Sequence, residues 1–185
     1  LPSGDAFDEL RATAEFAAAF VAWKLEDQTF AQRMDTGKQI LKAHADTASS
    51  LPVAAWMHAE TLNRLGRYED AIAVLEKVKV EEEGEMFPSG VVYLMAQTFL
   101  KLDQIKRASE CVDRLLKSAD ESEKRLYEKL RLTCDMSQKP WGEMSDVVKK
   151  YISDNKGDLN ELLFISHQCG RVNRSLECRG LFSNV

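Results

Sequence analysis

Apolar residues recur along most of this chain at the three- and four-residue spacing of an amphipathic helix. Between residues 68 and 80 they fall at Ala71, Ile72, Leu75 and Val78, which share one helical face. The same spacing predicts helices over residues 5–25, 29–45, 52–65, 91–102 and 105–118. Turn positions at 66–67 and 103–104 separate paired helices, and glycine at 66 suits a helix C-terminus because it tolerates a left-handed backbone. The pattern therefore predicts an all-α chain of short helices joined in pairs.

This helical pattern repeats along the chain. A shift of 37 residues superposes residues 52–80 on the pair that follows, and small residues then mostly meet small ones and large residues large ones. The matched positions are Ala55 with Val92, Ala59 with Ala96, Leu62 with Phe99, Gly66 with Asp103, Tyr68 with Ile105, Ala71 with Ala108, Leu75 with Val112 and Val78 with Leu115. The chain thus contains at least two copies of one helix-turn-helix unit.

Two further copies follow with less similarity. At a shift of 36 the slots of the second copy are taken by Trp141, Met144, Val148 and Tyr151. A partial fourth copy is suggested because residues 170–176 resemble residues 66–72, which places Gly170 in the slot of Gly66. The first fifty residues read as two more helices that no single shift aligns with the repeats.

The first copy resembles a tetratricopeptide repeat (TPR). The residues that carry this resemblance are Trp56, Ala59, Leu62, Leu65-Gly66-Arg67-Tyr68, Ala71-Ile72, Leu75 and Val78. The resemblance implies a right-handed superhelical solenoid of antiparallel helix pairs, about ten helices in all. It predicts repeats at 52–85, 88–118, 120–155 and 157–182 within a region 51–185, and a divergent helical pair or cap at 1–50.

Net charge argues against nucleic acid as a ligand. The chain carries a formal charge of −5, divided into −7 over residues 1–100 and +2 over residues 101–185. Phosphate backbones are bound by clustered Lys and Arg, which this distribution does not provide. No apolar run approaches the length of a membrane span. We therefore expect protein partners, with no nucleic acid and no transmembrane segment.

No local signature of catalysis, cofactor or metal binding is present. The chain lacks a Gly-rich phosphate loop, a nucleophile elbow and a zinc-protease helix, so we expect a non-enzyme without a cofactor. One Cys/His group, His167, Cys169 and Cys178 with Cys134 upstream, fits zinc spacing poorly, and we expect no metal. Four scattered cysteines favour reduced thiols in an intracellular compartment, with the cytoplasm preferred to an organelle.

The resemblance places one helix of each pair along a concave groove. The residues of these helices that face away from their partners are Trp56, Glu60, Asn63, Arg64, Tyr93, Gln97 and Lys101. Aromatic residues beside amide and charged groups suit peptide binding, although Trp56 and Tyr93 could instead pack against a neighbouring repeat. The Hsp90/Hsp70 co-chaperone type of TPR binds a carboxylate with Lys and Asn, but Trp56 and Glu60 occupy those slots.

We therefore expect the function to lie in binding at the protein surface and not in catalysis. We interpret the chain as a non-enzymatic protein–protein interaction scaffold or adaptor, a subunit of a larger multiprotein assembly. Degenerate repeats favour this hypothesis, because a permanently embedded subunit need not keep a general peptide-binding code. The alternative is a reversible receptor for a short linear peptide motif, of a co-chaperone-like or trafficking-adaptor kind.

Overall fold

A computed structural model describes residues 4–47, 52–78 and 89–182 of this chain. These residues form ten α-helices and one short 3₁₀ segment, η1, and contain no strand. The α-helices are α1 Gly4–Leu25, α2 Phe30–Ala43, α3 Pro52–Arg64, α4 Tyr68–Leu75, α5 Ser89–Lys101, α6 Ile105–Ser118, α7 Glu121–Gln138, α8 Trp141–Asp154, α9 Leu159–Arg171 and α10 Ser175–Phe182. The predicted all-α class and helix number are confirmed. No helix in the described ranges is both long and apolar enough to cross a membrane.

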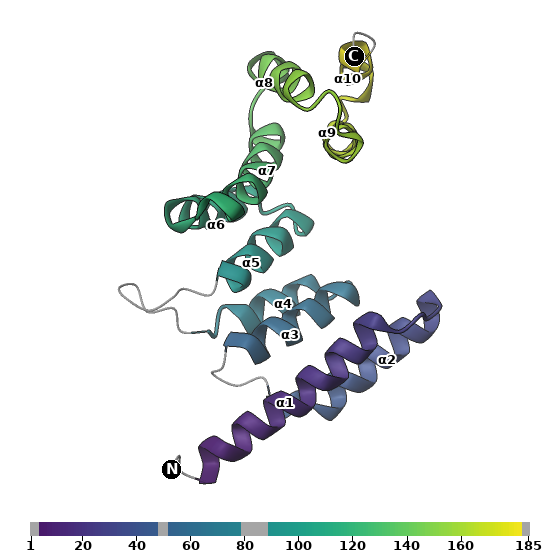
Figure 1. Ribbon diagram of the computed structural model, residues 1–185, viewed down its shortest axis with the longest axis vertical. Helices are drawn as coiled ribbons and strands as arrows, with labels where there is room; N and C mark the ends of the chain where they lie inside the picture. Colours follow the sequence, from purple (N-terminus) through teal and green to yellow (C-terminus); the bar gives the residue numbers. More distant parts are fainter. Residues whose placement is uncertain (1–3, 48–51, 79–88, 183–185) are drawn as a thin grey trace. The chain divides into compact units, whose positions relative to one another are not determined.

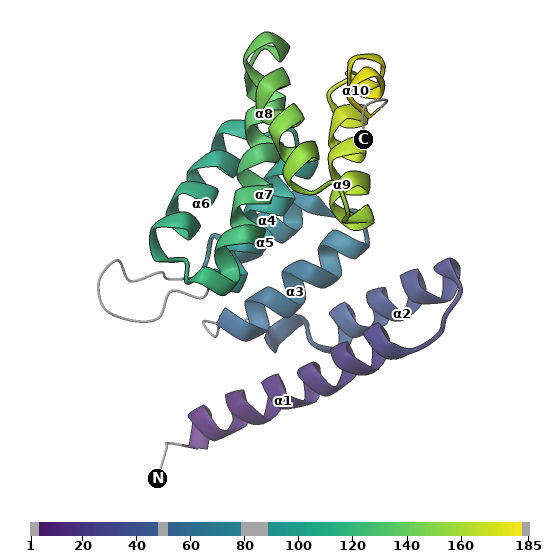
Figure 2. The ribbon, with the colours of Figure 1, turned by 45° about the horizontal axis from the view of Figure 1, so that its top comes forward.

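The chain divides into two compact units, Leu1–Cys111 and Val112–Val185, with the boundary inside α6. In unit 1, α1 packs against α2 and α3, and α3 packs against α4 and α5 (Figure 1). In unit 2, α7 packs against α8 and α9, and α9 packs against α10 (Figure 2). Each unit therefore contains consecutive helices that cover one another's apolar faces.

Six of the eight pairs of positions matched at a shift of 37 are buried, and the pairs Gly66 with Asp103 and Tyr68 with Ile105 are not. Ala59 and Ala96 are fully buried, as are Ala71 and Ala108. The larger matched residues are buried as well: Leu62, Leu75, Val78, Phe99, Val112 and Leu115. Small residues at these sites let neighbouring helix backbones approach closely, and the large residues beside them fill the remaining space. The alternation of small and large residues that the two copies share therefore falls mostly on buried positions.

Three of the helix-to-helix turns share one backbone geometry. Gly66, Asp103 and Asn173 all have positive φ, at 74°, 57° and 57°. In each case the next residue donates its backbone N–H to the carbonyl five residues before it: Arg67 to Leu62 at 2.9 Å, Gln104 to Phe99 at 2.9 Å and Arg174 to Cys169 at 2.8 Å. This is the Schellman arrangement that ends a helix at a left-handed residue. The left-handed backbone predicted at Gly66 is confirmed.

Two details of the predicted pattern are wrong. The helix expected over residues 68–80 ends at Leu75, and a turn occupies residues 76–78. The predicted fourth copy places Gly170 in the slot of Gly66. Gly170 lies inside α9, and the residue that has the left-handed backbone of Gly66 is Asn173. The correct shift is therefore three residues longer, because asparagine as well as glycine tolerates this conformation. The acidic run 81–85 lies outside the described residues.

One cysteine differs from the prediction that the cysteines are reduced thiols. Cys111 and Cys134 are buried and are not disulfide-bonded. Cys169 is buried in unit 2 and is disulfide-bonded. The expectation of a reduced thiol is therefore wrong at Cys169. The side chain of Cys178 lies outside the described residues.

We predict that Gly66→Ala lowers the free energy of unfolding by about 1–2 kcal/mol, because a Cβ is strained in the left-handed region. Space is not the cause, since no atom lies within 4 Å of the position of the added Cβ. Denaturant unfolding followed by circular dichroism measures the effect. Gly142→Ala is the matched control, because Gly142 lies in helix α8 with the same open space. It should be neutral or stabilising, and an equal loss in both variants would contradict the explanation.

Candidate functional site

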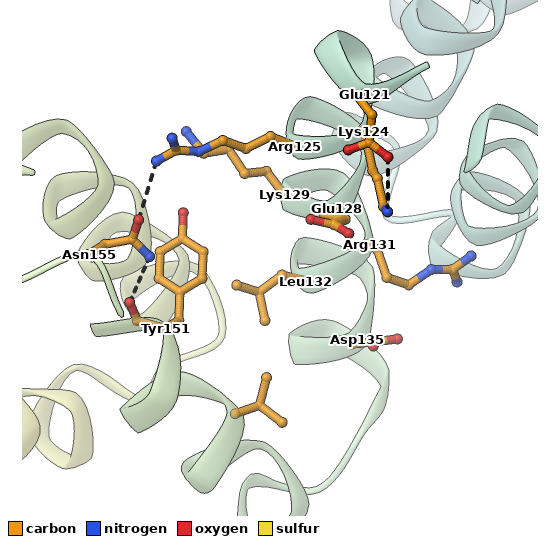
Figure 3. Close-up of a pocket in the computed structure, with 11 residues that line it drawn as sticks. Glu121, Lys124, Arg125, Glu128, Lys129, Arg131, Leu132, Asp135, Tyr151 and Asn155 are labelled. Carbon is orange, nitrogen blue, oxygen red and sulfur yellow. Dashed lines mark hydrogen bonds and ion pairs between the residues drawn. The ribbon is translucent and has the colours of Figure 1, made fainter. Parts of the chain in front are cut away.

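A pocket of about 630 Å³ lies on unit 2, between the exposed face of α7 and the second half of α8 (Figure 3). Helix α7 contributes Glu121, Lys124, Arg125, Glu128, Lys129, Arg131, Leu132 and Asp135, and the α8 side contributes Val147, Tyr151 and Asn155. The α7 residues recur every three or four positions, so they form one helical face. The walls of the pocket are therefore formed mainly by the side chains of two neighbouring helices.

Capping residues at the starts of α7 and α9 help to position this face. Asp120 caps α7, its carboxylate accepting the backbone N–H of Ser122 at 2.8 Å and of Glu123 at 3.0 Å. Asp158 caps α9 in the same way, accepting from Asn160 at 3.0 Å and from Glu161 at 3.3 Å. Such caps satisfy backbone donors that a helix start leaves unpaired. They fix where α7 and α9 begin, and hence where their first side chains lie.

A buried carboxylate holds the polar wall of the pocket in place. Glu161 is buried, and Lys129 donates to it at 2.6 Å and Arg125 at 2.9 Å. The hydroxyl of Tyr151 donates to the other carboxylate oxygen. Arg125 also donates to Asn155 at 3.2 Å, a contact drawn in Figure 3. Because one carboxylate from α9 binds residues of α7 and α8, the three helices are tied together at this corner.

The electrostatics of this corner keep Glu161 ionised. Burial would raise the pKa of Glu161, but hydrogen bonds from Lys129 and Tyr151 and the charges of Lys129 and Arg125 outweigh burial and lower it. The pKa of Tyr151 is raised by burial and by its hydrogen bond to Glu161. Tyr151 therefore stays protonated and donates to a carboxylate that stays charged.

The lining carries charge of both signs. Seven of the eleven residues are charged, four basic and three acidic. Among the described residues, Glu128 makes no ion pair, and Lys124 pairs only with Glu121, at 3.6 Å. Val147, 47% exposed, adds an apolar contact. A mixed surface of this kind suits a polypeptide, which presents amides, charges of either sign and apolar side chains, better than the uniformly anionic phosphate backbone of a nucleic acid.

The lining of the pocket consists of charged, amide, aromatic and aliphatic side chains. None of its lining residues is Ser, Thr, Cys or His. In the described ranges, no three His, Cys, Asp or Glu side chains gather closely enough to hold a metal ion. The lining presents charged and hydrogen-bonding groups at the surface of the pocket.

The residues predicted from sequence as a groove lie elsewhere, on α3 and α5 of unit 1. They are Trp56, Glu60, Asn63, Arg64, Tyr93, Gln97 and Lys101. The half-buried Trp56 makes an edge contact with Phe20 of α1, ring centroids 5.6 Å apart. Glu60 pairs with Arg64 at 2.8 Å and with Lys24 of α1 at 3.6 Å. These α3 residues thus contact α1, in agreement with the packing alternative for Trp56.

One other member of the predicted set connects α3 to α5, and two more contact each other within α5. Asn63 donates to the hydroxyl of Thr98 at 2.7 Å, and Gln97 donates to the hydroxyl of Tyr93 at 3.0 Å. Lys101 is exposed. The structure therefore brings the seven residues into one unit but engages most of them in internal contacts. Their role in partner binding stays a prediction.

Sequence reasoning missed the pocket on α7 and α8. Its signal was present as charged residues spaced by three and four over residues 121–135, a pattern typical of any solvated helix face. What distinguishes this face is the carboxylate of Glu161, which is 36 residues from Arg125 and is invisible to a local pattern. Comparison of the chain with protein-family models, curated proteins and solved structures finds no match.

We predict that Glu161→Gln destabilises the chain by about 1–3 kcal/mol, because Lys129 and Arg125 lose a charged acceptor. The effect depends on pH. Since the pKa of Glu161 is below its ordinary 4.5 in the folded state, its stabilisation is complete above that value and is lost as pH falls through the folded value. Urea unfolding of wild type and variant between pH 3 and 7 measures this.

The control is Glu121→Gln, because the side chain of Glu121 is 94% exposed and pairs only with Lys124. It should change stability little at any pH. A Glu161→Gln variant that keeps the full acid sensitivity of the wild type would show that another group is responsible.

Proposed function

We propose that this chain is a non-enzymatic protein-interaction scaffold or adaptor, a subunit of a multiprotein assembly, which binds a polypeptide segment of a partner at the pocket on α7 and α8. The observation that carries the proposal is the ordered, mixed-charge lining of that pocket. Arg125 and Lys129 extend from α7 toward Tyr151 and Asn155 (Figure 3). Arg125 is 64% exposed and uses only one of its nitrogens in contacts with described residues, so it retains N–H donors for a ligand.

The repeated helix pairs support the same proposal. A TPR-like solenoid presents extended helix faces to partners and needs no chemical centre. The shared Schellman turns at Gly66, Asp103 and Asn173 support the repeat interpretation, because unrelated helix pairs need not end in the same geometry. The TPR resemblance and the superhelical arrangement belong to this proposal.

Substitutions in the pocket should abolish partner binding without unfolding the chain. We predict that Lys124→Glu with Val147→Glu removes most of a partner retained by the tagged wild-type chain, because an apolar contact is lost and one charge is reversed. Both side chains are about half exposed, so the fold should tolerate the change. Quantitative mass spectrometry of co-purified proteins gives the loss, and circular dichroism checks the fold.

The matched control is Leu126→Glu with Lys149→Glu. These residues lie on the same two helices, are similarly exposed and do not line the pocket. Partners should be retained by the control and lost from the pocket variant. Equal retention by both variants would disprove the pocket as the binding site. Elution of the endogenous chain at the size of a single chain, in gently prepared lysate, would disprove its role as a stable subunit.

A further inference from the structure

Helix α1 has two apolar faces. The face formed by Thr13, Phe16, Phe20 and Trp23 is buried. Phe16 contacts the rings of His44 and His58, centroids 5.0 and 4.7 Å apart, which anchors α1 to the end of α2 and to α3. The opposite face is exposed and consists of Phe7, Leu10, Ala14, Ala18, Val21 and Leu25, called the α1 stripe below. One face is thus used within unit 1 and the other is not.

The α1 stripe is continuous and strongly exposed. Its four large residues are 51–81% exposed: Phe7 62%, Leu10 56%, Val21 51% and Leu25 81%. The six stripe residues are spaced by three or four and their pattern repeats after eleven residues, which is 3.67 residues per turn and close to the 3.6 of an α-helix. The stripe therefore runs along nearly all of a 22-residue helix, about 33 Å long. Contiguous exposed apolar surface of this kind marks an interaction site.

The charges along the stripe indicate what covers it. On a helical wheel Asp8 and Glu15 lie along one side of the stripe, seven residues apart. Glu26 directly follows α1 and continues this side by one residue, since its backbone N–H still donates to the carbonyl of Ala22 at 3.0 Å. Arg11 lies on the same side and pairs with Glu15 at 3.1 Å, which offsets one acidic charge and leaves this side with a net charge of −2. Lys24, toward the other side, pairs with Glu60 and lies 5.8 Å from the Trp56 ring, so it belongs to the internal contacts of unit 1. The stripe thus has an acidic margin.

We propose that the α1 stripe binds an amphipathic helix of a partner protein, one whose apolar face is bordered by Lys or Arg. The apolar residues supply the contact, and the acidic margin selects the basic border and the direction of the bound helix. This surface lies on unit 1 and is separate from the pocket proposed above, so it goes beyond that function and makes the chain a binder with two surfaces.

The same charges disfavour a second copy of this chain as the occupant. In an antiparallel pairing centred near residue 16, the large residues would meet at both ends and Ala14 would meet Ala18. That arrangement places Glu15 beside Glu15 of the other copy and Asp8 beside Glu26. Like charges in such positions repel, whereas a basic border would be attracted.

Two synthetic 22-residue helical peptides with the same leucine stripe test the proposal. One has lysine margins and the other glutamate margins, and each is labelled and titrated with the full chain by fluorescence anisotropy at low salt. We predict at least tenfold tighter binding of the lysine peptide. Val21→Glu should weaken that binding at least tenfold, and Leu176→Glu, which alters an even more exposed apolar residue on α10, should leave it unchanged. Glu15→Lys with Glu26→Lys should reverse the preference between the peptides.

Several results would overturn the proposal. Equal binding of the two peptides would show that the acidic margin does not select the partner. Failure of both peptides to bind would show that the α1 stripe is not a binding site for such a helix. Binding that Val21→Glu leaves intact would place the contact elsewhere. A concentration-dependent dimer in sedimentation velocity that Val21→Glu abolishes would assign the stripe to a second copy of this chain.

Discussion

Every short helix of this chain depends on burying one face against a neighbour. Helices of eight to fourteen residues, such as α4 and α6, are marginal alone in water, because nucleation costs more than a few backbone hydrogen bonds return. Stability must therefore come from packing. The fully buried Ala71 and Ala108 allow that packing, since a larger side chain at either position would hold the helices apart. The repeat spacing seen in the sequence follows from this requirement.

Features set by local periodicity could be predicted from the sequence. The buried face of α4 and the turn at Gly66 depend on residues only a few positions apart, and both agree with the pattern. The start of α8 at Trp141 also matches the alignment at a shift of 36. The register of the last pair could not be obtained in this way. Gly170 and Asn173 are both residue types that tolerate a left-handed backbone, but only Asn173 adopts it. Residue type alone does not tell which of the two does so.

Features set by contacts between distant residues could not be predicted. The pocket depends on Glu161 reaching Lys129 and Arg125, which lie more than thirty residues away on another helix. In the sequence these are ordinary charged residues on amphipathic helices. Trp56 shows the converse: its groove position was inferred from the repeat, while its contact with Phe20 depends on how the N-terminal helix pair packs against α3. The unused face of α1 is hidden for a similar reason, since two apolar faces on one helix read as a single hydrophobic run.

The ion cluster around Glu161 has a consequence for the energetics of recognition. Long side chains such as Arg and Lys usually lose much rotational freedom when a ligand fixes them, and that loss subtracts from affinity. Here Arg125 and Lys129 are already restrained by a buried carboxylate, and Tyr151 is restrained by the same group. The conformational entropy of these side chains is therefore given up during folding. A ligand bound at this pocket, as proposed above, would meet groups that are already ordered, so it would lose less interaction energy to the ordering of these side chains.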